Sequence, residues 1–192
     1  MENNRLEAFS DGVLAIVITV MVLEMKVPHD ADLAALRGVL PTFLSYVLSF
    51  VYVGIYWNNH HHFMHAARQV DGRVLWANLN LLFWISLFPF ATAWMGENHF
   101  EAVPTALYGV VLLLAALAWV PFQRALIAAN GGRDATLARA LRRGNWKSWL
   151  SPLLYALGIP MAFVATWVAH LLYVAVALMW LVPDPRVEAE IT

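Results

Sequence analysis

Long apolar runs separated by short polar segments dominate the chain. Four of these runs are long enough, as helices, to cross the roughly 30 Å of hydrocarbon in a bilayer. They cover residues 8–26, 40–63, 74–95 and 103–123. The pattern predicts an all-α integral membrane protein.

The final apolar stretch, at 147–183, is too long for one crossing and has a Gly and a Pro near its middle. We interpret it as two shorter helices, at 147–164 and 166–183, joined by a tight turn near 163–166. Pro160 is expected to kink the first of them. The other prolines considered lie near expected helix ends, where a missing N–H costs least: Pro41, Pro89, Pro104, Pro121 and Pro152.

A single six-helix domain covering residues 1–192 would distribute its basic residues unevenly across the membrane. Of the twelve Lys and Arg residues, only Lys26 and Arg37 fall on one side. The others are Arg5, Arg68, Arg73, Arg124, Arg133, Arg139, Arg142, Arg143, Lys147 and Arg186. Cytoplasmic loops carry the excess of Lys and Arg, so both termini and the basic loop 124–147 are predicted to be cytoplasmic. Residues 129–145 of that loop fit either a basic surface helix on anionic lipid or a plain topology signal.

The composition and the missing motifs exclude several classes of protein. The chain is 61% hydrophobic and 13% charged, which excludes a water-soluble fold, and its net charge of −1 gives no reason to expect a nucleic-acid partner. It has no Cys, so disulfides and thiolate sites are excluded. No nucleophile elbow, P-loop or dinucleotide fingerprint is present, so no enzyme activity and no cofactor are predicted. The T-V-G-Y-G filter of the usual potassium channels is also missing.

The start of the first helix carries the most informative polar residues. Arg5, Phe9, Ser10 and Asp11 lie within two helical turns. Charged and hydroxyl side chains that enter a bilayer are costly unless they have partners inside the protein. Two interpretations stay open here: Ser10 and Asp11 cap the helix, or they join a polar network.

Beyond this segment, four residues recur at helical spacing, which places them on one face of the helix. They are Ile16, Thr19, Val20 and Leu23. Such a stripe is normally a lipid-facing or packing surface, and periodicity alone does not make it a pore.

A second polar cluster ends the second helix, on the same side of the membrane as Arg5. It includes Trp57 and His60, which are candidate partners for the first helix. His61 and His65 are four residues apart, a spacing that can bind metal, but no Asp or Glu at ligand spacing completes a site. We therefore predict hydrogen-bonding histidines and no metal.

Arg5-x-x-x-Phe9-Ser10-Asp11 at the start of an apolar helix resembles the R-x-x-x-F-S-D signature of the TMEM175 family of potassium channels. Trp57-x-x-His60 is similar to the second-helix pattern of that family. The resemblance implies a potassium-permeable cation channel with one six-helix repeat, assembled as a homotetramer with the first helix lining the pore at a fourfold axis. In the family a large apolar side chain five residues after the motif Asp forms the constriction, which here is Ile16.

The same resemblance implies that Thr19, Val20 and Leu23 line the pore, with Val20 smaller than the Leu often found there. Arg5, Ser10 and Asp11 would be structural and tie helix 1 to helix 2 through Trp57 and His60. The permeant ion would be K⁺, and the expected location is the bacterial cytoplasmic membrane.

Two alternatives belong to other classes. A secondary transporter commonly binds substrate at broken helices, whereas the first helix has no Pro or Gly after Gly12. A His-based metal-binding membrane protein would need more ligands than the His cluster offers.

Overall fold

The computed structural model describes residues 3–132 and 146–181, and every regular element within those ranges is a helix. Predictions for residues 133–145 and 182–192, including most of the basic loop and Arg186, lie outside the described residues. The helices are α1 (Asn3–Leu23), α2 (Leu33–Ala66), α3 (Gly72–Ile85), α4 (Phe88–Glu97), α5 (Ala102–Ala129), α7 (Trp146–Val164) and α8 (Thr166–Leu181).

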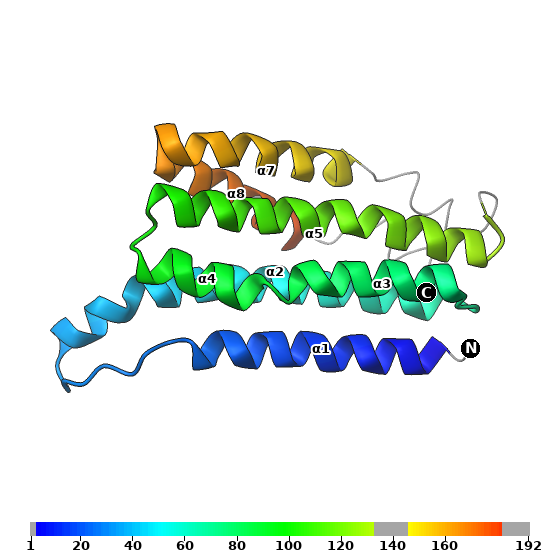
Figure 1. Ribbon diagram of the computed structural model, residues 1–192, viewed down its shortest axis with the longest axis horizontal. Helices are drawn as coiled ribbons and strands as arrows, with labels where there is room; N and C mark the ends of the chain where they lie inside the picture. The colour runs from blue at the N-terminus through cyan, green and yellow to red at the C-terminus, as the bar shows by residue number, and fades with distance from the viewer. Residues whose placement is uncertain (1–2, 133–145, 182–192) are drawn as a thin grey trace.

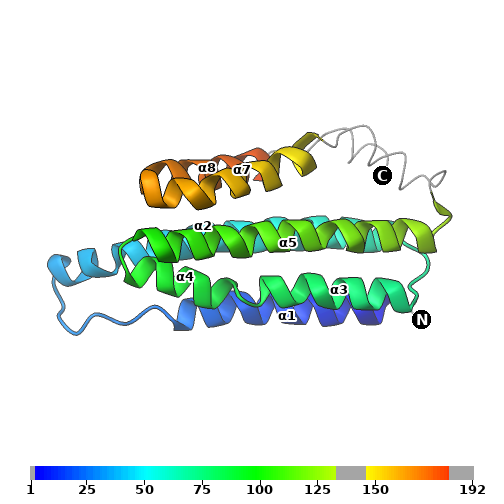
Figure 2. The ribbon, with the colours of Figure 1, turned by 45° about the horizontal axis from the view of Figure 1, so that its top comes forward.

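The helices run along one common axis in an elongated bundle (Figures 1 and 2). α1 forms one edge, the α7–α8 pair forms the opposite edge, and α2, α3, α4 and α5 lie between them (Figures 1 and 2). α5 packs against α3, α4, α7 and α8, whereas α1 packs against α2, α3 and α4. The first helix is therefore covered by the bundle on one side only.

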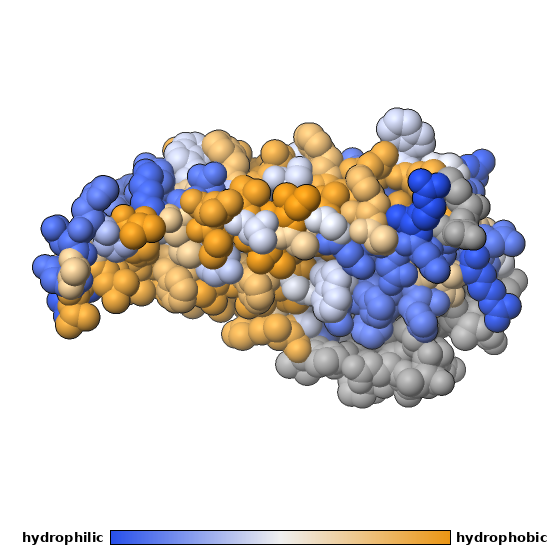
Figure 3. All heavy atoms as spheres, turned by 90° about the horizontal axis from the view of Figure 1, so that it is seen from below, coloured by the Kyte–Doolittle hydropathy of each residue, from blue (hydrophilic) through white to orange (hydrophobic). Residues whose placement is uncertain are grey.

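Within residues 3–132 and 146–181, four stretches are long and apolar enough to cross a membrane. They are Asn3–Leu23, Leu33–Ala66, Gly72–Glu97 and Ala102–Ala129. α1, with 21 residues, is about 31 Å long at 1.5 Å per residue, close to the hydrocarbon thickness. α7 and α8 are shorter than α1, with 19 and 16 residues, and only Ala165 separates them. On the face shown in Figure 3, an apolar band lies between two more hydrophilic ends. The prediction of an all-α fold with membrane-spanning helices is confirmed.

The third crossing is divided, where the sequence predicted one helix over 74–95. α3 ends at Ile85 and α4 begins at Phe88. Pro89 lacks the N–H that would bond to the carbonyl of Ile85, so the helical ladder stops one turn earlier. Ser86 closes the end of α3: its N–H donates to Leu82 O at 2.8 Å, and its hydroxyl donates to Phe83 O at 2.7 Å.

The second helix begins earlier than residue 40. Asp32 caps it by accepting a hydrogen bond from the N–H of Ala35 at 2.7 Å, and Pro41 lies inside the helix instead of at its end. The first turns of α2 bend away from the rest of the helix, as expected where a proline removes one backbone hydrogen bond (Figures 1 and 2). Pro121 is likewise inside α5, which continues to Ala129.

Buried hydroxyl groups join the helices in the centre of the bundle. Ser49 on α2 is hydrogen-bonded to Thr92 on α4 at 2.6 Å and to Tyr108 on α5 at 2.9 Å. Tyr52 donates to the carbonyl of Tyr173 on α8 at 2.6 Å. Side-chain hydrogen bonds between helices satisfy polar groups that have no access to water in a bilayer.

α2 and α4 approach closely at Gly96. A Cβ on this residue would lie 2.6 Å from the Cα of Thr42 and 2.4 Å from the hydroxyl of Ser45, so the α2 backbone itself stands in the way. Gly54, in contrast, has no atom within 4 Å of its Cβ position.

We predict that Gly96→Ala lowers stability by about 1–3 kcal/mol, because one extra methyl group overfills a closed contact. The measurement is thermal unfolding of the detergent-solubilised protein. Gly54→Ala is the matched control and should be neutral or slightly stabilising, since alanine favours the helix by about 0.5–1 kcal/mol. Equal unfolding midpoints for both variants would contradict the close contact.

Candidate functional site on the first helix

One face of α1 is buried in the bundle and the opposite face is open. The buried face consists of Leu6, Ser10, Leu14, Val17 and Met21. On the open face, Phe9 is 52% exposed, Ile16 62% and Leu23 79%. A continuous apolar stripe therefore remains uncovered along the helix.

The four predicted stripe residues divide between this open face and its border. Ile16, Thr19 and Leu23 are exposed, whereas Val20 is half-buried at the edge. The hydroxyl of Thr19 donates to the carbonyl of Ile16 at 2.9 Å. Since a hydroxyl has one hydrogen and two lone pairs, this bond leaves the oxygen of Thr19 able to accept or to bind a cation.

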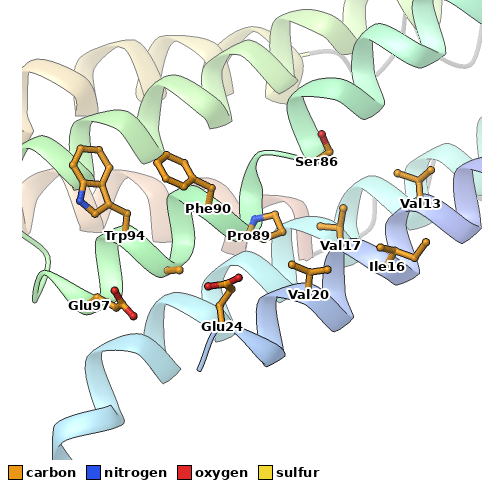
Figure 4. A pocket seen from close by; sticks show the side chains of 11 residues that line it. Val13, Ile16, Val17, Val20, Glu24, Ser86, Pro89, Phe90, Trp94 and Glu97 are labelled. Carbon is orange, nitrogen blue, oxygen red and sulfur yellow. The ribbon is translucent and has the colours of Figure 1, made fainter. Parts of the chain in front are cut away.

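A groove of about 580 Å³ borders the stripe between α1 and α4. In Figure 4 the valines of α1 face the aromatic residues of α4 across it, and Ser86 marks the break between α3 and α4. Its lining residues are Val13, Ile16, Val17, Val20, Glu24, Ser86, Pro89, Phe90, Ala93, Trp94 and Glu97. The groove is thus apolar along most of its length and acidic at one end.

An ion pair lies at that acidic end, where Lys26 follows α1 and Glu97 ends α4. Lys26 Nζ lies 2.7 Å from Glu97 Oε1, and the hydrogen bond and charge of Glu97, with a smaller contribution from Glu24, raise the pKa of Lys26. The pair connects the segment after α1 to the end of α4.

A buried hydrogen-bond chain near the other end of the bundle holds α1. Asn78 Nδ2 on α3 donates to Ser10 Oγ at 3.0 Å, and Ser10 donates to Leu6 O at 2.9 Å. His60 Nε2 on α2 lies 2.8 Å from Asn78 Oδ1. Because the amide group of Asn78 already donates, its oxygen must accept, and the hydrogen of His60 is on Nε2. His60 also stacks on Phe122, with ring centroids 5.1 Å apart.

Two further contacts join α1 directly to α2. Trp57 Nε1 donates to Asp11 Oδ1 at 3.1 Å, and His61 Nδ1 lies 2.9 Å from Glu7 Oε1. Polar side chains from three helices therefore meet around the start of α1.

Comparison with known proteins identifies the family. A family model described as "Endosomal/lysosomal potassium channel TMEM175" matches residues 5–89. A protein of Chryseobacterium sp. (strain P1-3) described as a potassium channel is 48% identical over 188 residues, which cover 98% of this chain and 97% of that protein. The chain belongs to the TMEM175 family. It is accordingly a multi-pass membrane protein.

Two other relatives show how far the likeness extends. The crystal structure of a lysosomal potassium-selective channel TMEM175 homolog from Chamaesiphon minutus superposes with a TM-score of 0.80 at 27% identity, covering 93% of this chain and 96% of that one. The human endosomal/lysosomal proton channel TMEM175 is 38% identical over 96 residues, which are 43% of this chain but 19% of the human protein.

The TMEM175 family match covers α1 from residue 5 and all of α2 and α3, and so the whole hydrogen-bond network around Asn78. The structure brings Asp11 and Trp57 together, as the motif predicts, but it places Ser10 against α3 instead of α2. Asn78, the residue that joins Ser10 to His60, was missed by the sequence analysis. The available signal was an Asn within the apolar α3, because a polar residue at that depth needs a partner.

Arg5 and Phe9 do not join this network. Both are exposed on the open face of α1, and Arg5 makes no hydrogen bond or ion pair with any residue in 3–132 or 146–181. The same described residues contain no group of three or more His, Cys, Asp or Glu side chains arranged to hold a metal.

We predict that Asn78→Ala destabilises the protein by about 1–3 kcal/mol, because His60 and Ser10 lose their buried partner. Thermal unfolding in detergent measures this change. Asn80→Ala, two residues along α3 at an exposed position, is the matched control and should stay near wild type. If both variants unfold at the same temperature, Asn78 does not hold the helices together.

Proposed function

We propose that this TMEM175-family protein is a potassium-permeable channel whose pore is lined by α1 from several copies of the chain. The relatives named above as potassium channels support the ion, and the open apolar face of α1 supports the pore. That face is the observation on which the proposal rests, because a 21-residue membrane helix at the edge of a bundle leaves a complete stripe uncovered.

One protomer does not enclose a pore with a single helix. Closing a channel with one helix per subunit requires rotational symmetry, and in the proposal four copies meet around a fourfold axis. The homotetramer places the stripe of Ile16, Thr19 and Leu23 on the axis, with Val20 at its border.

The proposed constriction is a ring of four Ile16 side chains. A narrow apolar neck opposes ion passage by excluding water, and it can gate by dewetting. One turn further on, the hydroxyl oxygens of Thr19 replace part of the hydration shell of K⁺, while their hydrogens stay on the carbonyl of Ile16. The channel works without a T-V-G-Y-G filter, without catalysis and without a cofactor.

The network around Asn78 supports this pore from behind. It fixes the buried face of α1 against α2 and α3, so the orientation of the open face is set by hydrogen bonds in the protomer. The motif residues Ser10 and Asp11 are thereby structural, as are Trp57 and His60.

The break between α3 and α4 is the observation that favours the alternative function, a secondary transporter. Transporters often bind substrate at broken helices, but the groove at this break is lined mainly by valines, a proline and aromatic residues. Ser86 is the polar side chain at the break, and the two glutamates of the groove lie at its outer end. The groove therefore lacks the converging polar groups of a substrate site.

The proposed orientation follows the charges. Arg5, Arg68, Arg73, Arg124 and Lys147 belong to the ends of α1, α2, α3, α5 and α7 that meet at one end of the bundle, opposite Lys26 and Arg37. In the proposal this basic end faces the cytoplasm and the protein lies in the bacterial cytoplasmic membrane.

The assembly is tested by native mass spectrometry of the protein in mild detergent. We predict a homotetramer, because the described part of the protomer leaves the open face of α1 uncovered. A monodisperse monomer would contradict the pore.

The constriction is tested by Ile16→Asn. A polar ring removes the dewetting barrier, so single-channel conductance should rise and the K⁺/Na⁺ preference should fall. Reversal potentials under bi-ionic conditions measure the preference. Val17→Asn is the control: Val17 is 4% exposed on the buried side, so this variant should lose stability and keep its selectivity. Unchanged conductance and selectivity in Ile16→Asn would remove this residue from the pore.

A further inference from the structure

A second groove, of about 680 Å³, lies between α2 and α8 and has no role in the proposed channel. Its α2 wall includes Leu48 and Val51, and its α8 wall includes Val174 and Leu178. The groove belongs to the α7–α8 side of the bundle, away from the edge formed by α1 (Figures 1 and 2). In the proposed channel α1 faces other subunits, so this side faces the surrounding lipid, and the inference rests on that function.

The polar residues of the groove are concentrated at one end. His99, in the turn between α4 and α5, and His170, one turn into α8, lie there, beside the exposed indole of Trp167. His170 Nε2 lies 3.3 Å from the hydroxyl of Thr105, and its ring packs edge-on against Phe100 at 5.0 Å. Lys26 lies at the same end of the bundle, and its ion-pair partner Glu97 ends α4 two residues before His99.

This distribution matches an amphiphile. The polar end lies at the level of the membrane interface, where Trp is preferred, and the apolar walls run from there toward the middle of the bilayer. α8 has 16 residues and is about 24 Å long, which exceeds the roughly 15 Å depth of one hydrocarbon leaflet. The groove is therefore long enough to hold the whole hydrocarbon chain of a membrane lipid.

We propose that this groove is a phospholipid-binding site. One acyl chain lies between α2 and α8, and the headgroup phosphate lies beside His99 at the membrane interface. In a bilayer, water does not fill an apolar groove, and a persistent acyl chain restores the van der Waals contacts that the two helices do not supply to each other.

The test uses the full chain reconstituted in vesicles of phosphatidylethanolamine and phosphatidylglycerol, extracted in mild detergent and examined by native mass spectrometry. The wild-type protein should retain phospholipid adducts through the extraction. Val174→Trp fills the groove and should lose most of them. Leu171→Trp, on the same helix but outside the groove, is the matched control and should retain them.

Leu48→Trp, which fills the groove from α2, repeats the test if Val174→Trp fails to fold. His99→Ala should weaken retention while leaving the groove open. Equal adducts in the groove-filling and control variants would overturn the proposal. The proposal would also be overturned if the groove-filling variants lost the oligomer but kept their lipid adducts, because the groove would then be a contact between protein subunits. The lipid count does not depend on ion flux, so this result stands apart from that of the channel experiments.

Discussion

The structure depends on one requirement: a polar side chain inside a bilayer must find its partner in the protein. Asn78 meets this requirement for two helices at once, because its amide group donates to Ser10 on α1 and its oxygen accepts from His60 on α2. These hydrogen bonds join α1, α2 and α3 at one point, and they fix the rotation of α1 about its own axis. The apolar side chains on the opposite face are oriented by this buried polar contact.

α1 is thereby a helix with two different environments. Its buried face packs against α2, α3 and α4, and its open face carries Phe9, Ile16 and Leu23. In the proposed tetramer, fourfold symmetry turns this open face away from lipid, because it brings four copies of the face to a common axis.

The sequence was informative where hydropathy decides the outcome and less so where single residues do. The apolar runs predicted an all-helical membrane protein, and the R-x-x-x-F-S-D segment predicted the family. Two features were missed: the break before Pro89, because an apolar run continues across it, and the early start of α2 at Leu33, because Pro41 was expected to mark a helix end. Asn78 was missed because its partners are 18 and 68 residues away in the chain, and a spacing pattern does not show such contacts.

The proposed channel requires Ile16 to lie on the ion pathway, and the absence of native Cys makes a direct test simple. Ile16→Cys protein in vesicles is treated with a cationic methanethiosulfonate reagent while K⁺ flux is recorded, with Val17→Cys as the control. We expect the reagent to block flux through the Ile16→Cys channel, because a permanent positive charge is attached within the pore, and to leave Val17→Cys unaffected. Continued flux through fully modified Ile16→Cys protein would contradict the account.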